Sequence, residues 1–230
     1  MISHALLPFL VPVKSFQQDL AEIRQVWQPH FNTSQYVGEW TVIALRSPGG
    51  LQESIFPDEL GVAGFQDTPL MNSCPGISQW VGQLQCEIMS VRLLKLQNGA
   101  SIKDHRDFEL SFEQGEARLH LPISTNNEVW FHIDDVPLQM NEGECWYMNA
   151  NLRHRVINNG ASPRIHLVID CKVNDWLKDI FAHAQKTVVN DYSSEQEENI
   201  IRELRLQHNP VASALADELE NNLKARAVNQ

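Results

Sequence analysis

The chain has 230 residues, of which 43% are hydrophobic and 20% are charged, and its formal net charge is −11. This length and composition predict one sizeable globular core rather than two full domains. The acidic balance argues against a nucleic-acid partner and against docking on anionic lipid, because both require a basic surface.

The cysteines and the apolar segments bear on the cellular compartment. The four cysteines form no CxxC pair. Residues 5–13 are apolar, but the run is short, contains Pro8 and Pro12 and lacks a basic flank, and no run is long enough to cross a bilayer. We therefore expect free thiols in a reducing cytoplasm and no membrane association.

The N-terminal part predicts few regular elements. Residues 14–28 carry apolar side chains at helical spacing, which indicates a helix packed on the core. Residues 40–45 predict a strand that ends in the turn Ser47-Pro48-Gly49-Gly50. Residues 51–88 have no regular pattern apart from a helix expected around 76–85.

Short strands separated by turn residues dominate the middle of the chain. Asn-Gly and similar pairs between apolar alternations are strong signals for hairpins. A mainly β fold with flanking helices is expected, built on a double-stranded β-helix, that is, a cupin-like jelly roll. The predicted strands are 89–96, 107–112, 116–123, 128–133, 136–140, 144–148, 154–158 and 164–170.

Helices are expected after the last strand. Asn174 or Asp175 caps the first, and residues 193–207 and 210–223 predict two more. The expected division is a jelly-roll domain over 1–190 and a helical extension over 191–230. The extension either packs on its own jelly roll or lies beside the pocket mouth or in a homodimer interface.

The segment His105-Arg106-Asp107 is the first candidate for a functional site. Residues i and i+2 of a strand share a face, so His105 and Asp107 can point at one atom. An HxD pair alone is common by chance, but His154 on a later strand completes two histidines and one carboxylate. That is the ligand set of non-haem Fe(II) oxygenases. The alternative for His154 is an edge histidine bonded to a carbonyl group.

Three cationic or imidazole side chains extend this pattern. Arg164 begins an apolar strand, and an inward arginine is costly unless an anion pairs with it. The alternative is an exposed arginine at a strand end. Arg118 and His120 share one strand face, which is either the concave face, where they would suit a carboxylate, or a solvated outer face.

Residues 89–171 resemble the aspartyl/asparaginyl β-hydroxylase-like Fe(II)/2-oxoglutarate dioxygenases, including small bacterial amino-acid hydroxylases. The resemblance rests on Asn98-Gly99-Ala100, His105-Arg106-Asp107, Arg118-Leu119-His120-Leu121, Gly143-Glu144-Cys145-Trp146-Tyr147 and His154 with Arg164-Ile165-His166-Leu167-Val168. The segment from Trp40 to Gly50 also looks like the substrate-side strand and loop of the small bacterial members.

The resemblance implies a set of roles. His105, Asp107 and His154 would bind Fe(II), Arg164 would bind the distal carboxylate of 2-oxoglutarate, and Arg118 with His120 would contact a cosubstrate or substrate carboxylate. The namesake of the family lacks the carboxylate ligand that Asp107 provides, and Leu94 stands where it has a hydroxyl group. Both departures favour a free amino-acid substrate over a peptide.

The implied reaction hydroxylates an unactivated C–H bond of a small amino acid or related acid, with O2 as oxidant and with release of succinate and CO2. Arg118 or Arg46 would hold the substrate carboxylate. The alternatives are hydroxylation of Asp or Asn side chains in peptides, a cupin-type metal enzyme without 2-oxoglutarate, and a non-catalytic cupin-like binding module.

Overall fold

A computed structural model describes residues 1–24, 26–55, 64–107, 110–189, 194–206 and 209–228. The chain divides into two compact units, Ile2–Val188 and Val189–Gln230 together with Met1. In the described residues, no helix is both long and apolar enough to span a membrane.

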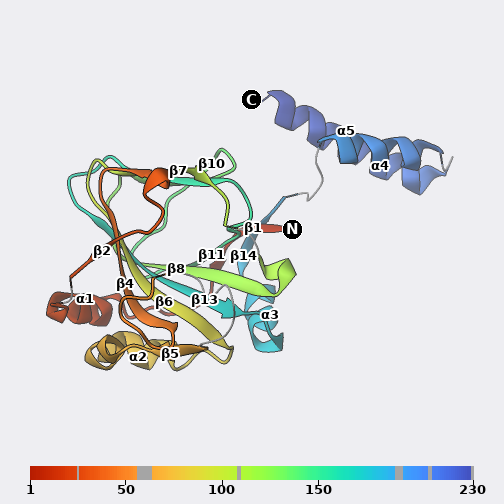
Figure 1. Ribbon diagram of the computed structural model, residues 1–230. Helices are drawn as coiled ribbons and strands as arrows, with labels where there is room; N and C mark the ends of the chain where they lie inside the picture. The colour runs from red at the N-terminus through yellow and green to blue at the C-terminus, as the bar shows by residue number, and fades with distance from the viewer. Residues whose placement is uncertain (25, 56–63, 108–109, 190–193, 207–208, 229–230) are drawn as a thin grey trace. The chain divides into compact units, whose positions relative to one another are not determined.

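Two facing antiparallel sheets form the larger unit (Figure 1). The nine-stranded sheet has the order β14-β1-β11-β8-β13-β6-β4-β2, with β5 paired to β4. The five-stranded sheet has the order β10-β9-β12-β7-β3. This arrangement confirms the expected jelly roll.

The strands have the following bounds: β1 Ile2–Leu7, β2 Gln28–Pro29, β3 Tyr36–Val37, β4 Trp40–Pro48, β5 Phe65–Asp67, β6 Ile88–Leu96, β7 Ser101–His105, β8 Glu116–Ser124, β9 Val129–Ile133, β10 Val136–Leu138, β11 Cys145–Met148, β12 His154–Asn158, β13 Arg164–Lys172 and β14 Gln185–Val188. The helices are α1 Val13–Glu22, α2 Pro75–Val81, α3 Asp175–Ala182, α4 Ser194–Leu206 and α5 Pro210–Val228, with 3-10 turns at Thr33–Gln35, Pro69–Ser73 and Phe112–Gln114.

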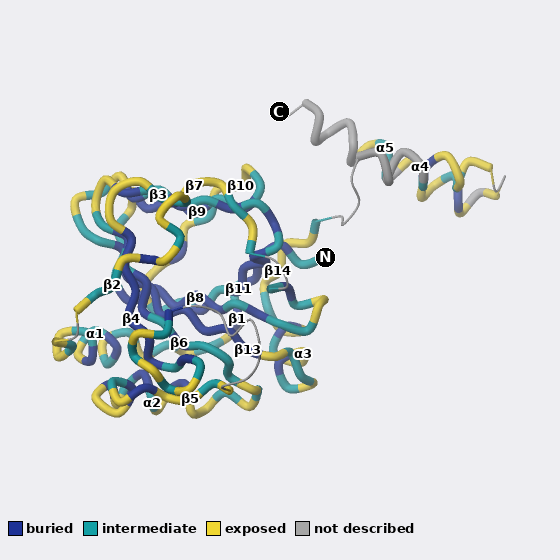
Figure 2. Tube along the Cα trace, in the orientation of Figure 1, coloured by how far each residue is buried: buried dark blue, intermediate teal, exposed yellow. Residues whose placement is uncertain are grey.

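The hydrophobic core lies on the outer face of the larger sheet, where α1, α2 and α3 cover it. Alternate residues of the central strands supply this face: Ile165, Leu167 and Ile169 from β13 and Leu119, Leu121 and Ile123 from β8. Phe16 of α1, Ile77 of α2 and Phe181 of α3 pack on them. The intervening residues therefore face the other sheet across the interior of the jelly roll. In Figure 2 these central strands are mostly dark blue, because consecutive residues along them are buried.

Most expected elements are confirmed, with several corrections. Of the strand expected over 107–112, the described residues 107 and 110–112 are not in a strand, and residues 108–109 lie outside the described part. The strand in this region is β7, which ends at His105. The helix expected over 14–28 ends at Glu22, because Ile23 is extended. Strands β1 and β14 were not expected; they pair with each other at one edge of the larger sheet.

Two local predictions are confirmed at the level of hydrogen bonds. The Asn174 side chain accepts the Leu177 N–H at 3.0 Å and caps α3. The turn after β4 closes through the Gly50 N–H and the Ser47 carbonyl at 3.0 Å, and Gly49 and Gly50 both adopt positive φ angles there.

Candidate active site

The His-Asp-His set comes together at one end of the smaller sheet. His105 ends β7, His154 begins β12, and these two residues are cross-strand partners. Asp107 follows two residues after β7. The candidate ligand atoms of the three side chains lie within 4.8 Å of one another, and Nε2 of His105 is 3.8 Å from Oδ1 of Asp107. The strand expected to begin at Asp107 is misplaced, but His105 and Asp107 still converge, because they lie at the end of β7 and just beyond it.

Both histidines are oriented by the same backbone contact. Nδ1 of His105 lies 2.8 Å from the Lys103 carbonyl, and Nδ1 of His154 lies 2.9 Å from the Leu152 carbonyl. A carbonyl oxygen only accepts, so each Nδ1 carries the proton and each Nε2 keeps a free lone pair. Two imidazoles and a carboxylate with this orientation fit a divalent iron ion.

The electrostatic surroundings keep these ligands in their metal-binding forms. Burial, with His105 nearby, lowers the pKa of His154 to about 4, so its imidazole is neutral at pH 7. Burial acts to raise the pKa of Asp107, but the Arg118 guanidinium, together with His154 and His105, outweighs it and lowers that pKa. The site therefore presents the ionised carboxylate of Asp107 beside the neutral imidazole of His154.

A chain of side chains crosses the interior from the histidines to the larger sheet. The His154 ring stacks on Phe131 with 6.1 Å between centroids, and Phe131 meets His120 edge to face at 5.6 Å. His120 in turn lies beside His166, with 3.4 Å between their Nδ1 atoms. The structure therefore places His120 of β8 and His166 of β13 toward the interior.

Arg164 follows His166 at the far end of this series of side chains. It is 1% exposed, which excludes the alternative of a surface arginine. Its Nη2 donates to Nδ1 of His166 at 2.9 Å, and no carboxylate of the described residues pairs with it. Burial lowers the pKa of its guanidinium to about 9. The buried atoms Nε of Arg164, Nε2 of His120 and Nε2 of His166 have no protein hydrogen-bond partner. A buried cation among unpartnered polar atoms fits the far carboxylate of 2-oxoglutarate.

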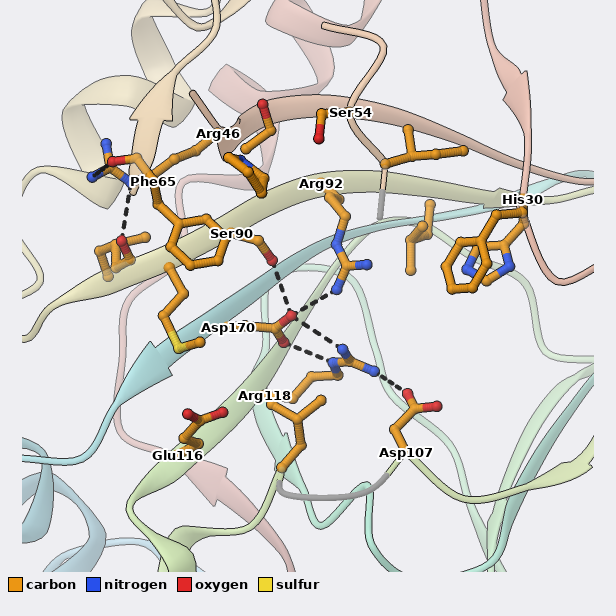
Figure 3. Close-up of a pocket in the computed structure, with 18 of the residues that line it drawn as sticks. His30, Arg46, Ser54, Phe65, Ser90, Arg92, Asp107, Glu116, Arg118 and Asp170 are labelled. Carbon is orange, nitrogen blue, oxygen red and sulfur yellow. Dashed lines mark hydrogen bonds and ion pairs between the residues drawn. The ribbon is translucent and has the colours of Figure 1, made fainter. Parts of the chain in front are cut away.

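An open cavity of about 840 Å³ adjoins the His-Asp-His set (Figure 3). His105 and Asp107 line it together with Trp40, Arg92 and Leu94. His154 and Arg164 do not line this cavity, so the metal set lies between an open side and a buried side. The open cavity and the buried surroundings of Arg164 are thus two separate spaces.

Arg118 lines the cavity, but its hydrogen-bond partners differ from those we expect. The expected partner is a ligand carboxylate rather than a protein group. The structure instead gives it two protein carboxylates: Nε and Nη2 donate to Asp170 at 2.7 and 3.1 Å, and Nη1 donates to Asp107. Burial alone would lower the pKa of Arg118, but the two carboxylates raise it, so it stays charged.

Arg46 also lies in the cavity wall, again with protein partners. Nη1 donates to Asp67 at 2.8 Å, Nη2 to the Phe65 carbonyl at 2.7 Å and Nε to the Ile88 carbonyl at 3.0 Å. These three bonds use three of its five N–H donors, so two remain for a ligand.

Sequence reasoning missed three residues of the cavity: Arg92, Asp170 and His30. Asp170 carried a signal, because it continues the alternation of Arg164 and His166 along β13. Arg92 carried a weaker one, as an arginine inside an apolar strand. His30 lies at the two-residue strand β2 and had no signal. Its ring stacks on Trp40 with 3.6 Å between centroids and 11° between planes.

Comparisons with known proteins agree with this geometry. The family model for aspartyl/asparaginyl β-hydroxylase matches residues 13–173. An L-proline cis-4-hydroxylase of Rhizobium meliloti is 27% identical, over 78% of this chain and 66% of that relative, so the chain spans just under two thirds of its length. An oxidoreductase of the 2OG-Fe(II) oxygenase family from Burkholderia pseudomallei has the same fold, with a TM-score of 0.51 and 12% identity over 74% of this chain and 85% of that one. Because the family model matches most of the chain's length, the chain belongs to the aspartyl/asparaginyl β-hydroxylase family.

Proposed function

We propose that this chain is an Fe(II)- and 2-oxoglutarate-dependent hydroxylase that acts on a small amino acid or a related carboxylate. One observation carries the proposal: a His-Asp-His set and a buried arginine without a carboxylate partner face one interior, connected by His120 and His166. Family membership and the name of the Rhizobium relative support it.

The roles of the chain's residues follow from their positions. His105, Asp107 and His154 would hold iron, and Arg164 would pair with the far carboxylate of 2-oxoglutarate, with His120 and His166 beside it. Iron and 2-oxoglutarate, when bound, would activate O2, so that one oxygen atom enters the C–H bond and the other enters succinate as CO2 is released. The protein binds and orients the reactants.

Arg92 is the cavity group best suited to the substrate carboxylate. Its side chain is 13% exposed, and one acceptor among the described residues, Oδ2 of Asp170, is bonded to it, at 2.6 Å. Its buried Nε has no partner. An arginine with free donors beside Trp40 and Leu94 suits a ligand with one carboxylate and a hydrocarbon body. Arg118 and Arg46 have fewer free donors.

The second candidate function is hydroxylation of Asp or Asn side chains in peptides, which the family name favours. A cavity of about 840 Å³ exceeds the need of one free amino acid, so size does not decide between the two. A non-catalytic binding module would have no use for an ionised Asp107 between two histidines.

Succinate release tests these functions. The chain would be incubated with Fe(II) and 2-oxoglutarate and with either free amino acids or short peptides that contain Asp or Asn. We expect succinate in amounts that match hydroxylated free amino acid. A preference for peptides would establish the second function, and no substrate-stimulated succinate across both panels would contradict both.

A further inference from the structure

Asp170 is the most heavily hydrogen-bonded carboxylate of the cavity. It lies in β13, and its side chain is 9% exposed. It accepts hydrogen bonds from Ser90 Oγ at 2.9 Å, from Arg92 Nη2 at 2.6 Å, and from Nε and Nη2 of Arg118 at 2.7 and 3.1 Å (Figure 3). Its two oxygens thus meet two guanidinium groups and one hydroxyl group.

The position of Arg118 depends on this carboxylate. Asp170 and Arg118 are direct cross-strand partners in the β13–β8 pair, and Asp170 bonds two of the three guanidinium nitrogens of Arg118. A bidentate pair of this kind fixes the plane of the guanidinium group. The third nitrogen, Nη1, consequently points in one direction only, toward Asp107 (Figure 3).

The two carboxylate oxygens of Asp107 face different residues, one Arg118 and the other His105. Nη1 of Arg118 bonds Oδ2, while Oδ1 lies 3.8 Å from Nε2 of His105. Asp107 is beyond the end of β7, and among the described residues its backbone makes one hydrogen bond, from its N–H to the Ala150 carbonyl at 2.9 Å. The side-chain contact with Arg118 therefore decides which oxygen faces the histidines.

We propose that Asp170 is a positioning residue for the metal site: through Arg118 it holds the carboxylate of Asp107 so that one oxygen faces His105 and His154. The inference rests on the proposed function, since it takes these three residues as the metal ligands. The same carboxylate also holds Arg92, the proposed substrate group. One buried anion thus orients both a metal ligand and a substrate-binding cation.

Cobalt binding tests the inference without turnover. Asp170→Asn keeps the shape of the side chain but loses its charge and replaces one acceptor oxygen with a donor that faces an arginine. Co(II) would be titrated into the full chain at a temperature where both proteins are folded, and affinity and visible absorption would be recorded. We expect affinity to fall about 10- to 100-fold, the effect usual for groups that orient metal ligands, with a changed cobalt spectrum.

Asp135→Asn is the matched control. Asp135 also pairs with two arginines, Arg153 at 2.6 Å and Arg155 at 3.2 Å, but it is a surface residue outside the cavity. Its replacement should leave cobalt affinity and spectrum unchanged. Ser90→Ala, which removes one of the bonds to Asp170, should weaken cobalt binding by a smaller factor.

The outcomes separate the inference from the proposed function. Unchanged cobalt affinity and spectrum in Asp170→Asn would overturn the inference and leave the proposed function standing, because Asp170 would then serve only stability. A wild-type chain that binds no Co(II) would overturn both. If Asp170→Asn does not fold, Arg118→Lys takes its place: a lysine cannot bond both carboxylates in the same way, so wild-type cobalt affinity in that variant would overturn the inference.

Discussion

The guanidinium group of Arg164 donates to Nδ1 of His166 across 2.9 Å inside the jelly roll. Since arginine only donates, Nδ1 of His166 accepts, and the proton of this neutral imidazole is on Nε2. Burial and the adjacent Arg164 hold the pKa of His166 well below its usual value, which agrees with this tautomer. Two unpartnered donors, Nε of Arg164 and Nε2 of His166, therefore remain for an anion.

Arg164→Met should sharply weaken binding of 2-oxoglutarate and stabilise the ligand-free chain. The buried dicarboxylate would lose its counter-charge, which costs about 2–5 kcal/mol. Without ligand, the wild type instead carries the cost of a buried cation that no described carboxylate offsets, and an apolar side chain of similar length removes it. Calorimetric titration of 2-oxoglutarate and thermal unfolding of the ligand-free chain measure the two effects.

Arg153→Met is the control for that substitution. Arg153 pairs with Asp135 on the surface, and its side chain is 43% exposed. Its loss should leave 2-oxoglutarate affinity unchanged and shift the melting temperature by at most about 4 °C, since surface pairs contribute at most about 1 kcal/mol. Wild-type 2-oxoglutarate affinity in Arg164→Met would remove Arg164 from the cosubstrate site.

The strand alternation explains why much of the fold and part of the site were predictable. In β13 and β8 apolar residues alternate with Arg164, His166, Arg118 and His120, so the amino-acid sequence alone assigns two residues per strand to one face. The partner of Arg118 could not be predicted in this way. It depends on the register that places Asp170 opposite Arg118, and register is a long-range property.

The misplaced strand at 107–112 has a different cause. In β7 only Ile102 is buried, and the other residues are polar and partly or fully exposed. This strand of the smaller sheet thus lacks the alternation of apolar and polar residues by which strands are recognised in a sequence. β1 and β14 were missed for related reasons: β14 is fully exposed, and β1 is a short apolar run near two prolines.

Arg92→Met should raise the KM for the substrate while leaving 2-oxoglutarate affinity unchanged. Its unpartnered Nε and its place in the cavity wall make it the proposed contact of the substrate carboxylate, and Arg164 lies away from that wall. Loss of a charged hydrogen bond to a ligand costs about 2–5 kcal/mol, so KM should rise at least tenfold. Steady-state succinate release with varied substrate measures it, and an unchanged KM would exclude the contact.

His30 should make the stability of the chain fall at acid pH. Burial, with Arg92 nearby, lowers its pKa from 6.5 to about 3 in the folded chain. Between these values the unfolded chain binds a proton that the folded chain does not, so the free energy of unfolding decreases as pH falls through this window. Above pH 6.5 the group has no effect, because both states are neutral.

His30→Phe isolates this contribution. Phenylalanine keeps a flat ring against Trp40 but takes up no proton, so one proton less is bound on unfolding. Between pH 5.5 and 4.5 the dependence of unfolding free energy on pH should therefore be shallower than in the wild type by about 1.4 kcal/mol per pH unit. Urea unfolding at a series of pH values measures both slopes, and equal slopes would mean that His30 is protonated in the folded chain.

Removal of the last two helices should leave the jelly roll folded and active. Helices α4 and α5 pack on each other, with Ile201, Ala212 and Ala216 buried and Arg205 paired to Asp217 at 2.6 Å. The larger unit ends its hydrogen-bonded sheet with β14, which pairs with β1. A chain that stops after residue 190 keeps that pair, and none of the residues proposed for the site lies beyond it.

We expect unchanged succinate release and substrate preference, and a melting temperature within a few degrees of the full chain. A folded truncated chain with altered substrate preference would place the helices at the cavity mouth, and a change from dimer to monomer in light scattering would place them in an interface between two copies.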